Sequence, residues 1–541
     1  MKKLTCIVLA LALALSVFTA CAKPEDTPSS VDQPSSNATS EPVENTDAPA
    51  TEEEPKVGGI LKIAVQSDNI KSALFTDLNN PEDQVRMGIV YESLMVEDAN
   101  GELQPYLLEK LESDPEALTY TLTLKQGIKF HDGSDFNAES CAFSLQLYKD
   151  KGRKSASFFG NIESIEATGD YEVTLHLSQW DSTIPRTLSR DCGYQTSKVA
   201  YETYGEDYLK ENPIGTGPFK MTSWTRDVVQ TFEKFSDYWQ GEPLLDGVEI
   251  YVYADSLVAQ AALDTGDIHA YYSTDYSLNK TFEADGYYVS RGLPMSMPMI
   301  NYQSVNENDP CFDVNVRRAI SYAIDSELLC ETIYNGYMAY TNQFAPTTSV
   351  YYNEDVVGYD YNPEKAKQLL AEAGYPNGFD TILHGKNEPV IVECLSAIQQ
   401  MLKEIGINAT INIIEGGDYG TALCGWEEGI FFHATSLPTA IINQAKSMYT
   451  QGLSGVVLGL TSILRPDDLH EAIMNASGAY TEEEARAYMK EAQRLIIDEY
   501  CLFKPVGCGY YTMVVSPTVK DHNWGTVVYY RADYHLVWLE K

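Results

Sequence analysis

The sequence predicts a mixed α/β protein with more than one lobe, on the basis of its length and of one stretch near residue 120. At 541 residues the chain is longer than a single hydrophobic core usually organises, so two or more lobes are expected. From Thr119 to Lys125 apolar and polar residues alternate, which predicts a half-buried strand. A turn follows at Asp132-Gly133, and Asn137 can then cap a helix with apolar residues at helical spacing.

The bulk composition indicates a packed protein with an acidic surface. Hydrophobic residues make up 44% of the chain, which is enough for packed domains, and the formal net charge is -40. Nucleic acid is therefore not expected as a partner, because its phosphates would be repelled and no basic stripe offsets the repulsion. Net charge bears on solubility more than on ligand identity. The acidic surface is therefore compatible with a cationic solute but does not predict one.

The first 20 residues are typical of a secretory signal peptide. Lys2 and Lys3 precede the apolar run from Leu4 to Phe18, which is too short to serve comfortably as a membrane-spanning helix. The string FTAC, ending at Cys21, resembles a bacterial lipobox, with Phe18 where Leu is usual. That resemblance implies cleavage before Cys21 and attachment of a diacylglycerol to its thiol. An ordinary signal peptide with an incidental cysteine is the alternative.

Residues 21–57 are predicted to be a disordered tether. They are rich in Pro, Ser, Thr, Glu and Asp and nearly lack large apolar residues, so they cannot bury enough surface to fold. No later stretch is long and apolar enough to span a bilayer; residues 455–464 come nearest and are far too short. The lipid would therefore be the sole membrane attachment.

The cysteines after the tether do not predict a metal site. They form no C-x-x-C pair, and no histidine lies at zinc-ligand spacing from them. Most are expected to be buried thiols. Export would permit disulfides, and a bond between Cys501 and Cys508 is conceivable, but the sequence cannot pair them. These cysteines are Cys141, Cys192, Cys311, Cys330, Cys394, Cys424, Cys501 and Cys508.

Periodicity and capping residues predict further elements in both halves of the chain. In the first half the expected elements are a buried strand at 60–65, a loop at 66–80, a helix at 85–95, paired strands within 163–177, a short helix at 257–264 and a strand at 267–272. In the second half they are a crossing to another lobe at 295–303, a helix at 316–325, a helix from Asn362 to Gly374, a helix at 395–405, a strand at 408–414, a helix at 482–500 and a return to the first lobe within 503–515.

Several of these stretches resemble one known family. Residues 122–145, LTLKQGIKFHDGSDFNAESCAFSL, closely resemble the signature of the family 5 extracytoplasmic solute-binding proteins, the peptide, nickel and oligosaccharide receptors of ATP-binding-cassette importers. NPIGTGPFKMTSW at 212–224, DYWQGEPLLDGVEIYVYAD at 237–255 and VRRAISYAID at 316–325 extend the match. The resemblance covers nearly everything from Gly58 to Lys541.

The resemblance implies a two-lobed, periplasmic-binding-protein-like α/β fold (type II, large variant with an extra subdomain in lobe I), with the ligand cleft between the lobes. It implies lobe I at 58–290 plus 503–541 and lobe II at 291–502. The expected function is that of a lipid-anchored, extracytoplasmic receptor that captures a peptide and delivers it to a membrane permease. A monomer without cofactor, metal or catalytic residue is expected.

The resemblance also implies which residues face the ligand. Core packing is an equally good explanation for each aromatic residue among them, because aromatic side chains dominate cores as well as binding sites. The ligand-facing residues implied are Tyr91, Phe158, Phe159, Arg190, Asn301, Tyr302, Tyr337, Phe344, Lys386, His433 and Thr435.

The sequence does not decide which class of ligand is bound. Peptide-binding members carry an Asp after a G-W pair in lobe II, whereas residues 429–438, GIFFHATSLP, have no Asp there. Lys386 stands about where dipeptide-type members carry an Arg, and Lys cannot make the bidentate bond. A zwitterionic dipeptide is therefore not expected. Longer peptides remain the default, and an oligosaccharide or other small solute is the alternative, since 37 tyrosines would suit either.

Two functions from other classes are alternatives to that of a receptor. A secreted hydrolase would need a catalytic constellation, and the chain has no G-x-S-x-G, H-E-x-x-H or P-loop motif. His131-Asp132 could be an acid/base pair, but it lies in a turn, where backbone geometry explains an Asp before Gly. A purely adhesive surface protein is the third possibility, and it would show no ligand-induced thermal shift.

Overall fold

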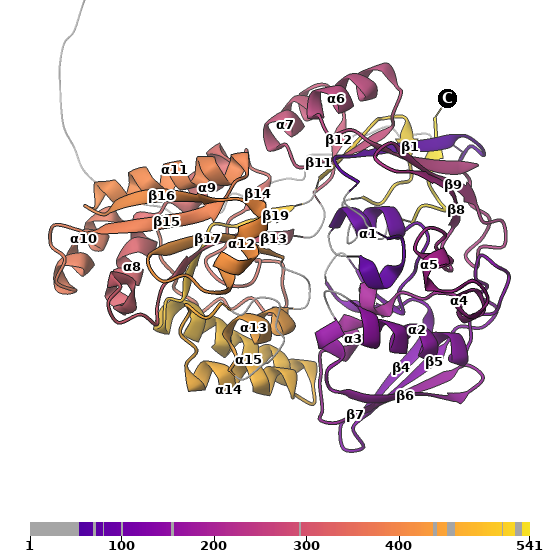
Figure 1. Cartoon of the computed structure of the whole chain (residues 1–541), viewed down its shortest axis with the longest axis horizontal. Coiled ribbons are helices and arrows are strands. Elements are labelled where there is room, and N and C mark those ends of the chain that lie inside the picture. Colours follow the sequence, from indigo (N-terminus) through magenta and orange to yellow (C-terminus); the bar gives the residue numbers. More distant parts are fainter. Residues whose placement is uncertain are drawn as a thin grey trace, which may run out of the picture. The chain divides into compact units, whose positions relative to one another are not determined.

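The computed structural model describes residues 54–68, 72–78, 81–98, 101–152, 156–291, 294–436, 441–451, 460–510, 512–524 and 533–540. The predicted signal peptide, Cys21 and nearly all of the predicted tether lie outside the described residues. Contacts group Pro55–Lys541 into one compact unit. Two sheets organise this unit, and we call the residues built on the first and second sheet lobe I and lobe II (Figure 1).

The first sheet has the strand order β12-β20-β11-β1-β10-β9-β8. The predicted strand at 60–65 is confirmed as β1, which runs parallel to both of its neighbours, β10 and β11. The strands are β1 (Ile60–Val65), β8 (Phe219–Thr225), β9 (Val229–Lys234), β10 (Gly247–Val252), β11 (Ala270–Ser273), β12 (Tyr288–Val289) and β20 (Thr512–Val515).

The second sheet has the order β14-β19-β13-β17-β15-β16, with β18 also paired to β13. Its strands are β13 (Pro294–Tyr302), β14 (Met338–Ala339), β15 (Asp380–Lys386), β16 (Asn408–Ile414), β17 (Ile430–Ser436), β18 (Phe503–Pro505) and β19 (Cys508–Tyr510). The chain enters it between Val289 and Pro294 and leaves it between Tyr510 and Thr512.

The exit from lobe II comes later than the boundary expected at residue 503. β18 and β19 pair with β13 and so belong to the second sheet. The Phe503 ring packs 5.7 Å from the Phe344 ring, inside the core of lobe II. Hydrophobic packing therefore keeps residues 503–510 with lobe II.

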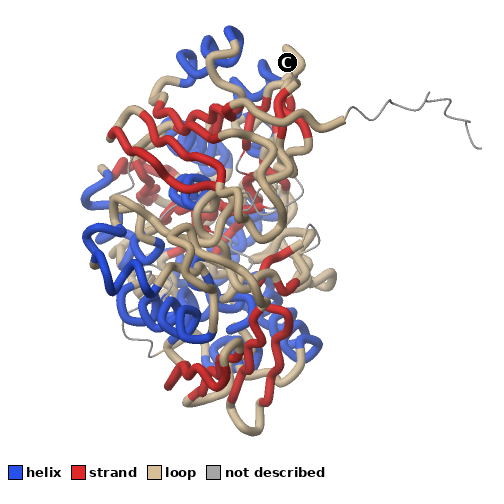
Figure 2. The backbone as a smooth tube through the Cα atoms, turned by 90° about the vertical axis from the view of Figure 1, so that its right-hand side faces the viewer, coloured by secondary structure: helices blue, strands red, loops and turns tan. Residues whose placement is uncertain are grey.

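Lobe I carries an additional antiparallel sheet in the order β4-β5-β7-β6, made of β4 (Leu108–Asp114), β5 (Thr119–Leu124), β6 (Ile162–Gly169) and β7 (Glu172–Leu177). It lies at the bottom of Figures 1 and 2, and α2 (Ala138–Lys151) packs on it. Asn137 caps α2 as predicted: its side chain accepts from Ser140 N at 3.0 Å, and Ser140 Oγ accepts from Asn137 N. The strand, turn and capped helix near residue 120 are confirmed.

The remaining elements surround these sheets. In lobe I they are α1 (Pro81–Met87), α3 (Ile184–Thr187), α4 (Lys198–Tyr204), α5 (Glu206–Leu209), α6 (Ser256–Thr265), α7 (Tyr276–Ala284) and the pairs β2 (Met95–Glu97) with β3 (Leu103–Pro105) and β21 (Val519–Lys520) with β22 (Trp538–Leu539). In lobe II they are α8 (Val314–Ala323), α9 (Ser326–Thr332), α10 (Pro363–Glu372), α11 (Pro389–Glu404), α12 (Gly416–Cys424), α13 (Ile441–Tyr449), α14 (Asp467–Ser477) and α15 (Glu482–Arg494), which continues as a π-helical turn over Leu495–Glu499.

The helix predicted over 85–95 is wrong. α1 ends at Met87, because the carbonyls of Ile89 and Val90 accept hydrogen bonds from the backbone of 217–219 instead of continuing a helix. Gly217 N donates to Val90 O at 2.9 Å. A Cβ on Gly215 would lie 2.1 Å from Val90 O, so only glycine permits this close approach of the two segments.

Each lobe has its own hydrophobic core, and a smaller cluster joins them near the crossing segments. The smaller cluster contains Tyr271 and Phe282 of lobe I together with Tyr337 of lobe II, all three wholly buried. In the part of the chain that the structure describes, no helix has the length and apolarity needed to cross a membrane.

Candidate functional site

The carboxyl ends of three parallel strands meet at one edge of the lobe II sheet. β15 pairs in parallel with β16 along its length and with β17 at Leu383 and His384. Lys386, His433 and Thr435 lie at or near these strand ends. In open α/β sheets, ligands bind outside the carboxyl ends of the strands. This edge therefore brings three of the predicted ligand-facing residues into one region.

His433 is the most constrained of these side chains. The residue is 5% exposed, and its Nδ1 lies 3.2 Å from the Tyr419 hydroxyl. Burial lowers the pKa of His433 to about 4, so the ring is neutral at pH 7. The ammonium of Lys386 lies 5.9 Å from the centre of the Tyr419 ring and is paired with Glu388. Tyr419 thus links two predicted residues from different strands.

Two buried polar atoms of the second sheet have no hydrogen-bond partner among the described residues. They are His433 Nε2 and Asn301 Oδ1. Asn301 is wholly buried, and its Nδ2 donates to Phe431 O at 3.3 Å. Asn301 and His433 share one face of the sheet, because Asn301 is opposite Phe431 and Met299 is opposite His433. Buried polar groups are nearly always satisfied by protein, water or ligand. Of the two, His433 lies nearer the carboxyl end of β17, so its Nε2 is the atom that a ligand at this edge can satisfy.

One edge of β17 is open over its last residues. β13 pairs with β17 from Ile430 to Ser436, whereas β15 pairs with it only at Ile430 and Phe431. From Phe432 to Ser436, no strand among the described residues covers the β15 side. An extended main chain can add to such an edge through backbone hydrogen bonds.

The corresponding edge of lobe I is held rigidly. Gln66, which follows β1, donates to the Tyr271 hydroxyl at 2.9 Å and accepts from Thr274 Oγ1 at 2.7 Å. Asp68 forms a buried ion pair with Arg86 at 2.5 Å and also accepts from Asp227 N at 2.8 Å. These bonds fix the described part of the predicted loop 66–80.

The two lobes touch through a set of polar contacts that we call the interlobe latch. From lobe I, the Trp180 indole donates to Ala479 O at 2.7 Å, and Ser182 N donates to Ser477 O at 2.8 Å. From lobe II, the Lys446 ammonium lies 3.5 Å from the Asp181 carboxylate, with both side chains largely buried. These contacts can form only while the lobes are together.

Other predicted residues lie in packed surroundings. Arg190 is 6% exposed. The Tyr302 hydroxyl bonds Ser321 Oγ at 2.7 Å in the core of lobe II. Tyr337 lies in the cluster between the lobes, with the Arg291 guanidinium 4.7 Å from its ring centre. Phe158 is half-buried, and the ring of the buried Phe159 lies 6.1 Å from that of Tyr148.

Thr435 and Phe344 also have defined partners. Gln444 on α13 donates to Thr435 Oγ1 at 2.6 Å. Phe344 packs against Tyr449 of the same helix, with ring centres 5.7 Å apart. The structure thus gathers Asn301, Lys386, His433 and Thr435 on the second sheet, and their role toward a ligand stays a prediction.

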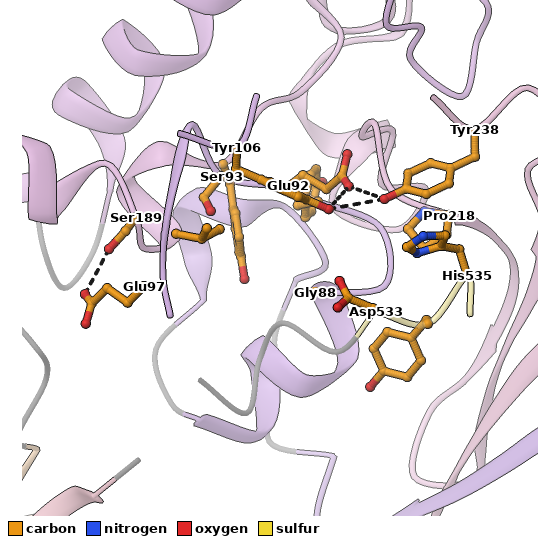
Figure 3. Close-up of a pocket in the computed structure, with 14 residues that line it drawn as sticks. Gly88, Glu92, Ser93, Glu97, Tyr106, Ser189, Pro218, Tyr238, Asp533 and His535 are labelled. Atoms are coloured by element: carbon orange, nitrogen blue, oxygen red, sulfur yellow. Dashed lines mark hydrogen bonds between the residues drawn. The ribbon is translucent and has the colours of Figure 1, made fainter. Parts of the chain in front are cut away.

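The sequence prediction missed the latch residues and a buried carboxylate in lobe I. Tyr91 stacks on Tyr194 with ring centres 5.9 Å apart, and both line a pocket whose empty volume of about 520 Å³ includes space open to solvent. Figure 3 shows this pocket. On the wall of this pocket, Glu92 accepts from the hydroxyls of Tyr106, Tyr238 and Thr216 at 2.8, 2.7 and 2.7 Å. The Trp239 indole donates to it at 3.0 Å. In the sequence, this place is marked only by the string VYESL, which contains Tyr91 and Glu92. The string does not indicate that Glu92 has hydrogen-bond partners far away in the chain.

The described cysteines all carry free thiols, so the conceivable bond between Cys501 and Cys508 is absent. All but Cys424 are buried, as expected for most of them. In the described ranges, no group of three or more His, Cys, Asp or Glu side chains could hold a metal ion.

The buried His433 predicts a pH dependence of stability. Its pKa is about 4 in the folded protein and about 6.5 when unfolded. The unfolded state therefore binds the proton first, and stability falls as the pH drops from 6.5 toward 4. Between pH 7.5 and 4.5 the loss caused by His433 is expected to be about 2 to 3 kcal/mol. Urea unfolding of the His433→Gln variant should show a correspondingly smaller loss. An equal loss in both proteins would contradict this.

Comparisons with known proteins agree with this architecture. The sequence profile of the bacterial extracellular solute-binding proteins, family 5, matches residues 102–447. The glutathione-binding protein GsiB of Escherichia coli O1:K1 is 31% identical over 346 residues, which cover 63% of this chain and 67% of GsiB. The relatives are solute-binding proteins rather than enzymes, as the sequence predicted.

Solved structures give the same result. DppA from Helicobacter pylori, solved with the peptide STSA, is 26% identical with a TM-score of 0.74, covering 90% of this chain and 99% of DppA. NikZ from Campylobacter jejuni, solved with Ni(L-His), is 20% identical with a TM-score of 0.73, covering 88% and 99%, and supports the fold alone. The chain therefore belongs to the family 5 bacterial extracellular solute-binding proteins, with their two-lobed fold.

Proposed function

We propose that this protein is the receptor of an ATP-binding-cassette importer and that it captures a peptide longer than two residues between its lobes. The open edge of β17 carries the proposal. From Phe432 to Ser436 this edge can bond the main chain of an extended ligand, which is the part that peptides of any sequence share. DppA from Helicobacter pylori, a relative at 26% identity, was solved with a four-residue peptide.

The side chains beside the open edge favour the same ligand class. His433 Nε2 is buried without a protein partner among the described residues, so an amide group of a peptide would satisfy it. Lys386 is paired with Glu388 and does not offer the bidentate contact of an arginine to a peptide carboxylate. Recognition through the main chain rather than through both termini suits a longer peptide better than a dipeptide.

Capture depends on closure of the lobes. A ligand that touches both lobes favours the closed form by its differential affinity for that form. The interlobe latch adds bonds that exist only in the closed form. The permease would distinguish the loaded from the empty receptor by this change in the relative position of the lobes.

The ligand class can be tested with the purified protein. Native mass spectrometry identifies any co-purified ligand, and thermal shift then compares di- to hexapeptides with malto-oligosaccharides. A peptide at a hundredfold excess over Kd should stabilise the protein by about 2.7 kcal/mol. Stabilisation by oligosaccharides alone would overturn the peptide assignment, and no stabilisation by either panel would overturn both candidate ligand classes.

We further propose a lipid anchor at Cys21 and an extracytoplasmic location. The proposal rests on the apolar run 4–18, on the FTAC string and on the composition of residues 21–57. The Cys21→Ala variant is expected to leave the membrane fraction and to appear soluble after cell fractionation. Cys6→Ala, which changes a cysteine within the signal peptide, is the matched control and should remain with the membranes. Unchanged retention of Cys21→Ala would contradict the anchor.

A further inference from the structure

A second pocket lies between the lobes, on the other side of α13 from the open edge of β17. It has an empty volume of about 940 Å³, part of it open to solvent. Tyr120 and Trp180 form its lobe I wall, and Tyr351, Ile442 and Tyr480 form its lobe II wall. Because the walls belong to different lobes, the pocket is complete only when the lobes are together.

The pocket is lined by aromatic rings in contact with one another. Tyr120 and Trp180 stack with ring centres 4.7 Å apart, and Trp180 meets Tyr480 edge to face at 6.4 Å. Tyr120, Trp180 and Tyr351 are each less than a tenth exposed. Rings held in this way can contact a further ring in an offset or edge-to-face geometry. Such a contact stabilises binding beyond the burial of the ring's apolar area.

The charges beside the pocket are compensated within the protein. The Arg186 guanidinium lies 3.1 Å from the Glu97 carboxylate and donates to Gly101 O at 3.0 Å. Glu482 is paired with Arg486 at 2.7 Å. A charged ligand group would have to displace one of these partners, so the lining favours an uncharged group.

α13 connects this pocket to the proposed peptide edge. Ile442 lines the pocket, Asn443 donates to Thr187 of lobe I at 3.4 Å, and Gln444 donates to Thr435 on β17 at 2.6 Å. A chain that passes around α13 follows half the circumference of a helix about 10 Å across, which is about 16 Å and corresponds to about five residues of extended chain at about 3.3 Å each. One peptide of about six or more residues can therefore reach both places.

We infer that this pocket is a specificity site for an aromatic side chain of the bound peptide. The inference rests on the proposed function and narrows it to peptides that carry a ring. Because the ring contacts both lobes, it adds to the stability of the closed form as well as to affinity.

The test uses hexapeptides in which one Phe is moved through an Ala background, with affinities measured by calorimetry on the full chain. At one position at least, the Phe peptide should bind about tenfold or more tightly than hexa-alanine. Ser113→Trp fills the pocket from its rim: Ser113 is exposed, lines the pocket and lies opposite Tyr120 in the register of β4 and β5. This variant should lose the preference for Phe and keep the affinity for hexa-alanine.

Glu112→Trp is the matched control, since Glu112 is exposed and its side chain points to the other face of the same strand. It should retain the preference for Phe. Peptides that bind wild type without any preference for a ring would overturn the pocket assignment and leave the proposed function standing. A preference that survives in Ser113→Trp would overturn it as well. Failure of every peptide to bind would instead overturn the proposed function and this inference together.

Discussion

Replacing Glu92 by alanine is expected to lower the free energy of unfolding by about 4 kcal/mol, because buried donors left without an acceptor cost about 1 to 3 kcal/mol each. Four donors would lose the Glu92 carboxylate: the hydroxyls of Tyr106, Tyr238 and Thr216 and the indole of Trp239. The two tyrosine hydroxyls lie 3.2 Å apart, so one of them could donate to the other, which leaves three donors to account for the loss. They come from segments up to 147 residues from Glu92, so the loss affects the whole of lobe I. Urea unfolding followed by circular dichroism measures the effect.

The effect of Glu92 should also depend on pH. Burial raises the pKa of Glu92 above its ordinary value, so the folded protein binds this proton more readily than the unfolded chain. Its contribution to stability therefore grows as the pH falls toward 4.5, and the gap between wild type and Glu92→Ala should widen. Glu166→Ala, at an exposed position, is the control and should stay within about 0.5 kcal/mol of wild type. A Glu92→Ala variant as stable as that control would contradict the role of the buried carboxylate.

Loosening the interlobe latch is expected to weaken peptide binding by about 50-fold or more, from the loss of about 2.5 kcal/mol of hydrogen-bond and ion-pair energy. The double variant Trp180→Phe/Lys446→Met removes the indole donor and the ammonium while keeping bulk at both positions. Asp181 still accepts from Asn161, Thr183 and Ser477, so no buried charge is left unsolvated. Calorimetry with a peptide that binds wild type measures the affinity.

The two changes act on one equilibrium, and their effects should combine. Both bonds exist only while the lobes are together, so each single variant should lose part of the affinity. Lys490→Met, an exposed lysine on α15, should bind as wild type does. If the double variant bound peptide with unchanged affinity, the latch would have no part in capture.

Local physics made much of the fold predictable. The alternation from Thr119 to Lys125, the cap at Asn137 and the cap at Asn362 each depend on neighbouring residues alone, and each is present in the structure. The prediction of a helix over 85–95 is wrong because the carbonyls of Ile89 and Val90 accept hydrogen bonds from the backbone of 217–219. The boundary expected at 503 differed because Phe503 packs into the core of lobe II. Both differences come from contacts distant in sequence.

The candidate site was harder to predict than the scaffold for the same reason. The resemblance directed attention to Asn301, Lys386, His433 and Thr435, which the second sheet brings to one region. The latch and the aromatic pocket join segments about 300 residues apart, as Trp180 and Ala479 illustrate with a separation of 299. No periodicity or cap within either segment indicates that they meet.

The central claim is that a peptide is enclosed by closure of the two lobes, and small-angle X-ray scattering tests it most directly. The radius of gyration should decrease when a saturating peptide, identified by thermal shift, is added to ligand-free protein. The Trp180→Phe/Lys446→Met variant should need a higher peptide concentration for the same decrease. A radius of gyration that stays constant while calorimetry reports saturated binding would contradict the account.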